Sequence, residues 1–97
     1  MPAGYVIVDV HATDAEKMAK YRVWSSKAMQ EYGAEILVRG GAFEVLEGPW
    51  TPQRLVVLKF ASRDQARAWY RSETYTHART LREGAGVVSM VAVDGVE

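Results

Sequence analysis

Two short runs of this chain are apolar on both side-chain parities, and this feature limits what the chain can fold into more than any other. The runs are Leu55–Phe60, interrupted by Lys59, and Val87–Val93, interrupted by Ser89. Strands of this kind are covered on both faces of a sheet, whereas a strand with one wet face alternates apolar with polar residues. The sequence therefore predicts two strands that need a cover on each face, and the first of them should be central.

A helical segment follows the first run almost at once. Ser62 stands three residues before Gln65, which is the spacing of a capping box, and Ser72 offers a second N-cap further along. Residues at helical spacing mark the face that we expect to pack on the sheet: Ala66, Trp69, Tyr70, Tyr75, Ala78 and Leu81.

The first third of the chain reads as one strand and one helix. Tyr5–Val10 is strand-like, and Thr13 with Glu16 has capping-box spacing at the start of a helix from Asp14 to about Tyr32. Gly33 is placed to end that helix. One stripe of this helix carries the residues expected to face the sheet: Met18, Tyr21, Ser25, Ala28 and Tyr32.

A hairpin is predicted between this helix and the central strand. Ala34–Arg39 and Ala42–Glu47 are strand-like, and Gly40-Gly41 between them could supply positive φ at both central positions of a tight turn. The proline-rich stretch 48–52 then reads as a loop.

The predicted order is strand, helix, hairpin, strand, helix, strand. This order matches the split β-α-β pattern of a ferredoxin-like fold, an α+β architecture with an antiparallel sheet and both helices on one face. With 97 residues we expect one domain, 1–97, and with no cysteine it has no disulfide or thiolate site.

A longer pattern of residues resembles one known family. It comprises Arg39-Gly40-Gly41, Glu44-Val45-Leu46-Glu47-Gly48, Trp50, Pro52, Arg54, Ala66, Trp69-Tyr70, Ser72, Tyr75, Ala78-Arg79 and Asp94-Gly95-Val96. The pattern is similar to that of domain-of-unknown-function 1330, in the dimeric alpha-beta barrel superfamily. The resemblance implies ferredoxin-like protomers that pair sheet to sheet, some relatives of which are cofactor-independent monooxygenases or other small-molecule enzymes. It implies no particular catalytic residue, and the Gly84-Ala85-Gly86 link departs from the family's pattern.

Charge and hydropathy argue against several classes of partner. Twelve basic and twelve acidic residues cancel, so there is no overall field to attract nucleic acid or an anionic membrane. We find no apolar stretch long enough to span a bilayer and no signal-like leader, and we expect a cytoplasmic protein. Arg63, Arg67 and Arg71 form a basic stripe on one helix face, which we interpret as a solvated surface rather than a nucleic-acid site.

Two histidines have an acid nearby in sequence. Asp9 and His11 share one strand face, but two ligands are too few for a zinc site, so we expect no metal there and favour a hydrogen-bonded pair. Glu73 and His77 are one helical turn apart, which is more typical of an exposed pair than of a catalytic base oriented by an acid.

The best candidate site combines aromatic residues and arginines near the seam between helices and sheet. The candidate ligand-binding residues are Tyr21, Trp24, Arg39, Trp69, Tyr75, Arg79 and Arg82. Aromatic walls with a few converging donors suit a small-molecule pocket, and arginine there would favour a carboxylate, phenolate or enolate. The same residues could instead be core fillers and surface salt bridges, with Glu73 or Glu83 neutralising the arginines.

Two classes of function stay open. The first is a homodimer, paired through its sheet face, that binds a small molecule, anionic by the argument above, and that could act without a cofactor by oxygenation or isomerisation of an aromatic or acidic metabolite. The second is a dimeric binding or interaction module without enzymatic activity. The homodimer follows from the doubly apolar strands, because helices can cover only one face of the predicted sheet.

Overall fold

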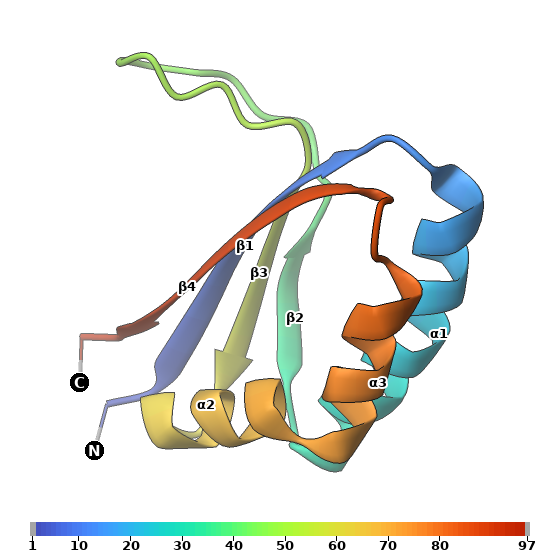
Figure 1. Cartoon of the computed structure of the whole chain (residues 1–97). Helices are drawn as coiled ribbons and strands as arrows, with labels where there is room; N and C mark the ends of the chain where they lie inside the picture. Colours follow the sequence, from blue (N-terminus) through green and yellow to red (C-terminus); the bar gives the residue numbers. More distant parts are fainter. Residues whose placement is uncertain (1, 97) are drawn as a thin grey trace.

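The computed structural model describes residues 2–96, which form one antiparallel sheet with helices packed against one of its faces (Figure 1). The elements in chain order are β1 (Gly4–Ala12), α1 (Ala15–Glu31), β2 (Glu35–Arg39), β3 (Leu55–Phe60), α2 (Arg63–Arg71), α3 (Glu73–Leu81) and β4 (Gly86–Asp94). The strands lie in the order β2-β3-β1-β4, and every neighbouring pair is antiparallel. This arrangement confirms the predicted ferredoxin-like fold, with β3 in the interior of the sheet. Within residues 2–96, no helix is both long and apolar enough to cross a membrane.

The core lies between the helices and the sheet face that carries Val6 and Val8. We call this the inner face. The buried residues of the core are Val6, Val8, Ala28, Leu58, Phe60, Ala66, Trp69, Tyr75 and Ala78. Trp69 is 1% exposed, and its ring centroid lies 5.3 Å from that of Phe60 and 4.3 Å from that of Tyr75. The spacing that placed Trp69 against the sheet is therefore confirmed.

Two serines divide the second helical segment as predicted. The Gln65 backbone N–H donates to Ser62 Oγ at 3.0 Å, and the Tyr75 N–H donates to Ser72 Oγ at 3.1 Å. Ser72 Oγ also donates to the Trp69 carbonyl at 2.8 Å, so one buried hydroxyl ends α2 and begins α3. The segment is two helices at an angle rather than one (Figure 1).

The cap of α1 was predicted one residue too early. Asp14, not Thr13, is the N-cap, and its Oδ1 accepts from the Lys17 N–H at 3.0 Å. The Thr13 and Asp14 N–H groups both donate to the Ala85 carbonyl, at 2.7 Å and 3.2 Å, which ties the start of this helix to the residue just before β4. The predicted end of this helix is confirmed, because Gly33 follows the C-cap residue with φ of 68°.

The predicted hairpin between Ala34–Arg39 and Ala42–Glu47 is wrong. β2 pairs with β3 instead, and the Gly40 N–H still donates to the Leu55 carbonyl at 2.7 Å. Gly40 has φ of 66°, but Gly41 is not among the positive-φ glycines, so the two-residue turn that needs positive φ twice does not form. Residues 41–54 form a long connection instead, which we call the arm.

The arm extends away from the three helices and beyond the end of the sheet (Figure 1). Its residues 41–51 are all exposed, and none of them lies in a strand or helix. Its base is fastened to β1 in two ways. Asp9 accepts from Trp50 Nε1 at 3.1 Å and from the Gln53 N–H at 3.0 Å, and the Val10 N–H donates to the Arg54 carbonyl at 2.9 Å. His11 Nε2 lies 3.0 Å from the same carboxylate, which confirms the hydrogen-bonded pair.

The other sheet face has no helix over it in the part of the chain that the structure describes (Figure 1). We call it the outer face. Its side chains include Tyr5, Ile7, Asp9, Leu55, Val57, Val87, Val91 and Val93. The valines of β4 are the most open of these, with Val87 at 65% and Val91 at 58% exposure. In a single protomer, β3 and β4, which are apolar on both faces, are covered by helices on the inner face only.

Candidate ligand-binding site

Two cavities lie between the helices and the inner face. The first, of about 400 Å³, lies between α2, the end of α3, β1 and β4, and we call it the α2 cavity. The second, of about 350 Å³, lies between α1 and the inner face of β1, β2 and β3, and we call it the α1 cavity. Trp69 and Met90 line both cavities. Each volume is in the range of a site for a small metabolite.

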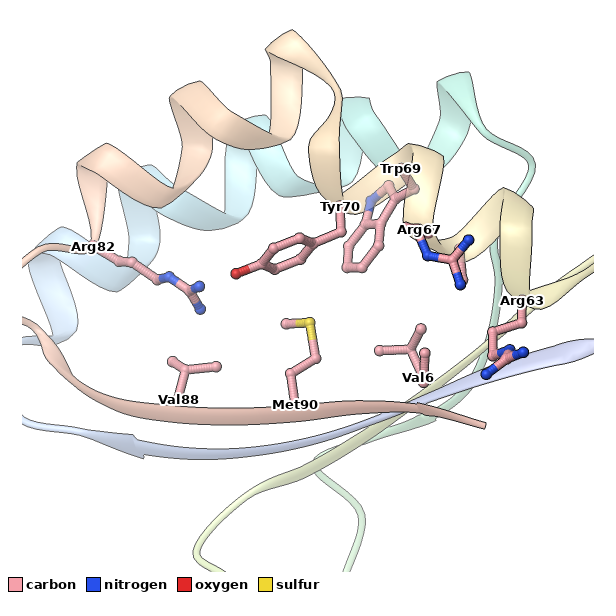
Figure 2. A pocket seen from close by; sticks show the side chains of 10 residues that line it. Val6, Arg63, Arg67, Trp69, Tyr70, Arg82, Val88 and Met90 are labelled. Atoms are coloured by element: carbon pink, nitrogen blue, oxygen red, sulfur yellow. The ribbon is translucent and has the colours of Figure 1, made fainter. Parts of the chain in front are cut away.

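The α2 cavity has an apolar floor and a cationic rim. Figure 2 shows Val6, Val88 and Met90 rising from the sheet, with Trp69 and Tyr70 above them from α2. The cationic lining residues are Arg63, Arg67 and Arg82. Within residues 2–96, no Asp or Glu lines this cavity. A cavity with this lining would hold a ligand with an apolar body and a negative charge.

Of the three arginines that line the α2 cavity, Arg82 is the one without a carboxylate partner among residues 2–96. Arg63 Nε lies 3.2 Å from Asp94 Oδ1, and Arg67 Nη1 lies 2.9 Å from Asp64 Oδ1. Arg82 Nη1 is buried, and among the described residues nothing accepts a hydrogen bond from it. Figure 2 shows its guanidinium pointing into the cavity above Val88. Neither Glu73 nor Glu83, the acids considered from the sequence, forms an ion pair with it in the described structure.

The rings of Tyr21 and Tyr75 lie next to the Arg82 guanidinium. Its central carbon lies 4.9 Å from the Tyr21 ring centroid and 6.0 Å from that of Tyr75. The Tyr21 and Tyr75 hydroxyls are 2.6 Å apart. Burial, together with the Tyr21 hydroxyl, raises the pKa of Tyr75 far above its ordinary value. The Tyr75 hydroxyl is therefore neutral at physiological pH and gives Arg82 no negative charge to pair with.

The α1 cavity has a similar mixture of side chains. Its apolar lining includes Val10, Met18, Met29 and Ile36, and its polar lining includes Tyr21 and Ser25. Three arginines, Arg22, Arg39 and Arg54, line it as well, and no acid of residues 2–96 does so. Unlike Arg82, none of these three has a buried guanidinium nitrogen without a partner in the described structure.

The seven predicted site residues do not form one pocket. Tyr21 and Arg39 line the α1 cavity, Arg82 lines the α2 cavity, and Trp69 lines both. Tyr75 is fully buried beside Tyr21.

The remaining two predicted residues, Trp24 and Arg79, line neither cavity. Trp24 packs edge-on against His77, with ring centroids 4.5 Å apart. His77 is thus in contact with an aromatic ring rather than paired with Glu73. Arg79 lies over the Tyr70 ring at 4.4 Å and donates to its hydroxyl at 3.2 Å.

Several lining residues were not recognised from the sequence. Arg63 and Arg67 were assigned to a solvated stripe, and both are exposed, yet they border the α2 cavity. Their spacing of four residues places them on one side of α2, but only the position of β4 shows that this side overlooks a cavity. In the sequence, only its apolar character distinguished Met90, and that does not identify it as a cavity-lining residue.

The outer-face cluster around Asp9 is a third arrangement of polar groups. Burial raises the pKa of Asp9, but the hydrogen bonds from Gln53, Trp50 and His11 and the charge of His11 outweigh it, so the net pKa is lowered. Asp9 is therefore held as a carboxylate. Within the described part of the chain, no third His, Cys, Asp or Glu joins Asp9 and His11 to complete a metal-binding group.

The strand order and the helices on one face of the sheet define a ferredoxin-like fold. A family model, the domain of unknown function DUF1330, matches residues 3–96, and the chain belongs to this family. The search of curated proteins found no match.

Solved structures resemble the fold at low sequence identity. A protein of unknown function from Rhodopseudomonas palustris is 17% identical, with a TM-score of 0.76 and coverage of 99% of this chain and 84% of that one. A proposed antibiotic biosynthesis monooxygenase from Caulobacter crescentus is 15% identical, with a TM-score of 0.64 and coverage of 99% and 92%. A dimeric protein of unknown function with a ferredoxin-like fold, from Bacteroides fragilis, is 10% identical, with a TM-score of 0.59 and coverage of 96% of each chain. These similarities establish the fold.

Proposed function

We propose that this protein is a homodimeric small-molecule-binding protein that holds an organic carboxylate in its α2 cavity. The observation that carries the proposal is the buried Arg82 Nη1, which faces an apolar cavity and lacks an acceptor among residues 2–96. A buried hydrogen-bond donor without an acceptor is costly, and a carboxylate is a strong, geometrically matched acceptor for a guanidinium.

The lining also indicates what the rest of the ligand looks like. Val6, Val88 and Met90 offer apolar contact from below, and the Trp69 and Tyr70 rings offer aromatic contact from above. A flat or aliphatic body of modest size, with its carboxylate toward Arg82, uses both features.

The side chains that line the α2 cavity are suited to binding rather than to catalysis. The α2 cavity presents guanidinium, phenol and indole groups, which bind and orient anions, and its described lining offers no histidine or carboxylate as a general base. This composition supports ligand binding as the primary role. A cofactor-independent enzyme acting on an aromatic or acidic metabolite is the second candidate, supported by the fold that the chain shares with the proposed monooxygenase.

A thermal-shift panel of aromatic and aliphatic carboxylates, each paired with its neutral amide, tests the binding proposal. We expect at least one carboxylate to raise the melting temperature and its amide not to do so, because a ligand at a hundred times its Kd adds about 2.7 kcal/mol to the folded state. The shift should disappear in Arg82→Ala and persist in Arg71→Ala, an exposed arginine of α2 outside both cavity linings.

Two results would contradict the binding proposal. One is a panel in which no carboxylate stabilises the wild-type protein. The other is a carboxylate that stabilises Arg82→Ala as much as the wild type, which would place its binding site elsewhere.

The homodimer is proposed on the evidence of the outer face. Val87, Val91 and Val93 are exposed there beside the half-buried Ile7 and Val57, and a twofold pairing of outer faces would cover all of them. The dimeric Bacteroides fragilis protein with the same fold supports assembly as a dimer.

A further inference from the structure

The arm carries large apolar side chains that its own protomer leaves exposed. They are Phe43, Val45, Leu46 and Trp50, and Leu46 is 87% exposed. A run of exposed apolar residues on a projecting segment is a feature of contact sites rather than of solvated loops. We therefore expect the apolar side chains of the arm to contact another surface.

The base of the arm lies on the outer-face side of the sheet. Asp9 has the same strand parity as Ile7, so its side chain belongs to the outer face. Trp50 and Gln53 both donate to this carboxylate, and Pro52 between them is buried. The arm is thus held at its base and starts on the same side as the uncovered valines, while Figure 1 shows its far end directed away from its own helices.

The arm would enlarge a dimer interface formed by the outer face. Strands about 4.8 Å apart and about 20 to 30 Å long give four strands a flat footprint of about 400 to 550 Å². A stable interface buries about 800 Å² of accessible surface on each partner, a measure that exceeds the flat footprint of the same face. The exposed apolar residues of the arm would add to the area that the outer face buries.

We propose that the arm of each protomer packs across β4 on the outer face of a second copy of this chain. The proposal rests on the homodimer of the preceding section and adds which segments meet. The arm leaves the sheet at the β2–β3 side, whereas the most exposed outer-face valines lie on β4 at the opposite edge. A twofold axis that sets two outer faces against each other can bring the arm of each copy over β4 of the other, and the two contacts are then identical.

Disulfide trapping tests the contact directly, because the chain has no cysteine of its own. Leu46→Cys protein that carries a size tag is mixed with untagged Val87→Cys, Val91→Cys or Val93→Cys protein and oxidised, and covalent heterodimer, which the tag separates from both homodimers, is measured on non-reducing gels. We expect at least one of the three mixtures to form heterodimer as the main product. The control is Leu46→Cys mixed with Val23→Cys, because Val23 on α1 has the same 58% exposure as Val91. Heterodimer in all three mixtures at no more than the level of this control would overturn the proposal.

Charge substitutions separate this proposal from the homodimer itself. Phe43→Asp with Leu46→Asp should raise the dimer Kd about 100-fold in sedimentation experiments, since two contact residues at about tenfold each multiply. Val23→Asp should leave the Kd unchanged. If Val91→Asp dissociates the dimer and the arm variant does not, the sheet-to-sheet homodimer stands and the arm contact is wrong. If the wild-type protein is monomeric, both proposals fail.

Discussion

Trp69 contributes to the core and to both cavities at once. Its indole packs between Phe60 of β3 and Tyr75 of α3, and it also lines the α1 and the α2 cavity. Its burial could be predicted from its helical spacing after Ser62, because spacing determines which face of a helix meets the sheet. Its role as a shared wall could not, since that depends on how far the neighbouring helices stand from the sheet.

Replacing Trp69 by alanine should therefore destabilise the folded protein strongly. We expect Trp69→Ala to lower the free energy of unfolding by about 3 to 5 kcal/mol, through lost burial and the void it leaves next to two existing cavities. Arg71→Ala on the exposed side of the same helix should change stability by about 0.5 kcal/mol or less. Urea denaturation of both variants provides the measurement, and equal midpoints would show that Trp69 is not an anchor.

Arg82 shows the limit of sequence reasoning about the site. Its position one turn after Ala78 placed it near the helix-to-sheet seam, but the same position suited a surface salt bridge with Glu83 equally well. What decides between these is the contact of the guanidinium with Tyr21, a side chain from the distant helix α1, alongside Tyr75 two turns earlier in α3. Contacts of that kind are not encoded in local spacing.

At the scale of elements, the strands and helices were predictable and the arm was not. Hydrophobic periodicity and serine caps located the strands and both ends of α2, because these signals are local. The stretch 42–47 has the composition of a strand, yet β2 pairs with β3 on one side, and no segment of residues 2–96 pairs with its other side at the edge of the sheet. Pairing partners are chosen across the whole chain, so a strand-like segment can be left out of the sheet.

The arm should depend on the ionisation of Asp9. The pKa of Asp9 is lowered in the folded protein, so the stabilisation from its carboxylate is present above the ordinary pKa of 3.8 and is lost as pH falls through the lower folded-state pKa. We expect Asp9→Asn to reduce hydrogen-exchange protection of the Gln53 amide at neutral pH, since a neutral side chain holds Trp50 and Gln53 less strongly. The wild type should show the same loss in strong acid.

Asp64→Asn is the matched control for this experiment. Asp64 is an exposed acid that pairs with Arg67 on α2, far in sequence from the arm. Its substitution should leave Gln53 protection unchanged. Full protection of Gln53 in Asp9→Asn would mean that the arm is held by contacts other than this carboxylate.

The whole molecule is a thin slab, with principal extents of 38 × 37 × 17 Å. A sheet with helices on one side leaves half of its apolar residues facing outward, and here those residues gather on β4 and the centre of the sheet. The doubly apolar strands predicted this need for a second cover before any fold was known. The sequence could not show what packs on the outer face, because the pattern of one chain does not give the position of a second copy.

Light scattering at micromolar concentration should give a dimer mass for the wild-type protein. Val91→Asp should shift that mass toward the monomer, because burying a carboxylate between two apolar faces is costly. Val23→Asp, at equal exposure on α1, should remain dimeric. A monomer mass for the wild type would show that the outer face stays open in solution.

The pairing of β1 with β4 joins the two ends of the sequence. β1 lies between β3 and β4, and its register with β4 runs from Gly4 opposite Asp94 to Ala12 opposite Gly86. Contacts between such distant segments slow folding, because a long loop must close before they form. In a chain that has paired β1 with β3 but not yet with β4, β1 is an open sheet edge. The pairing of β4 with β1 closes this edge.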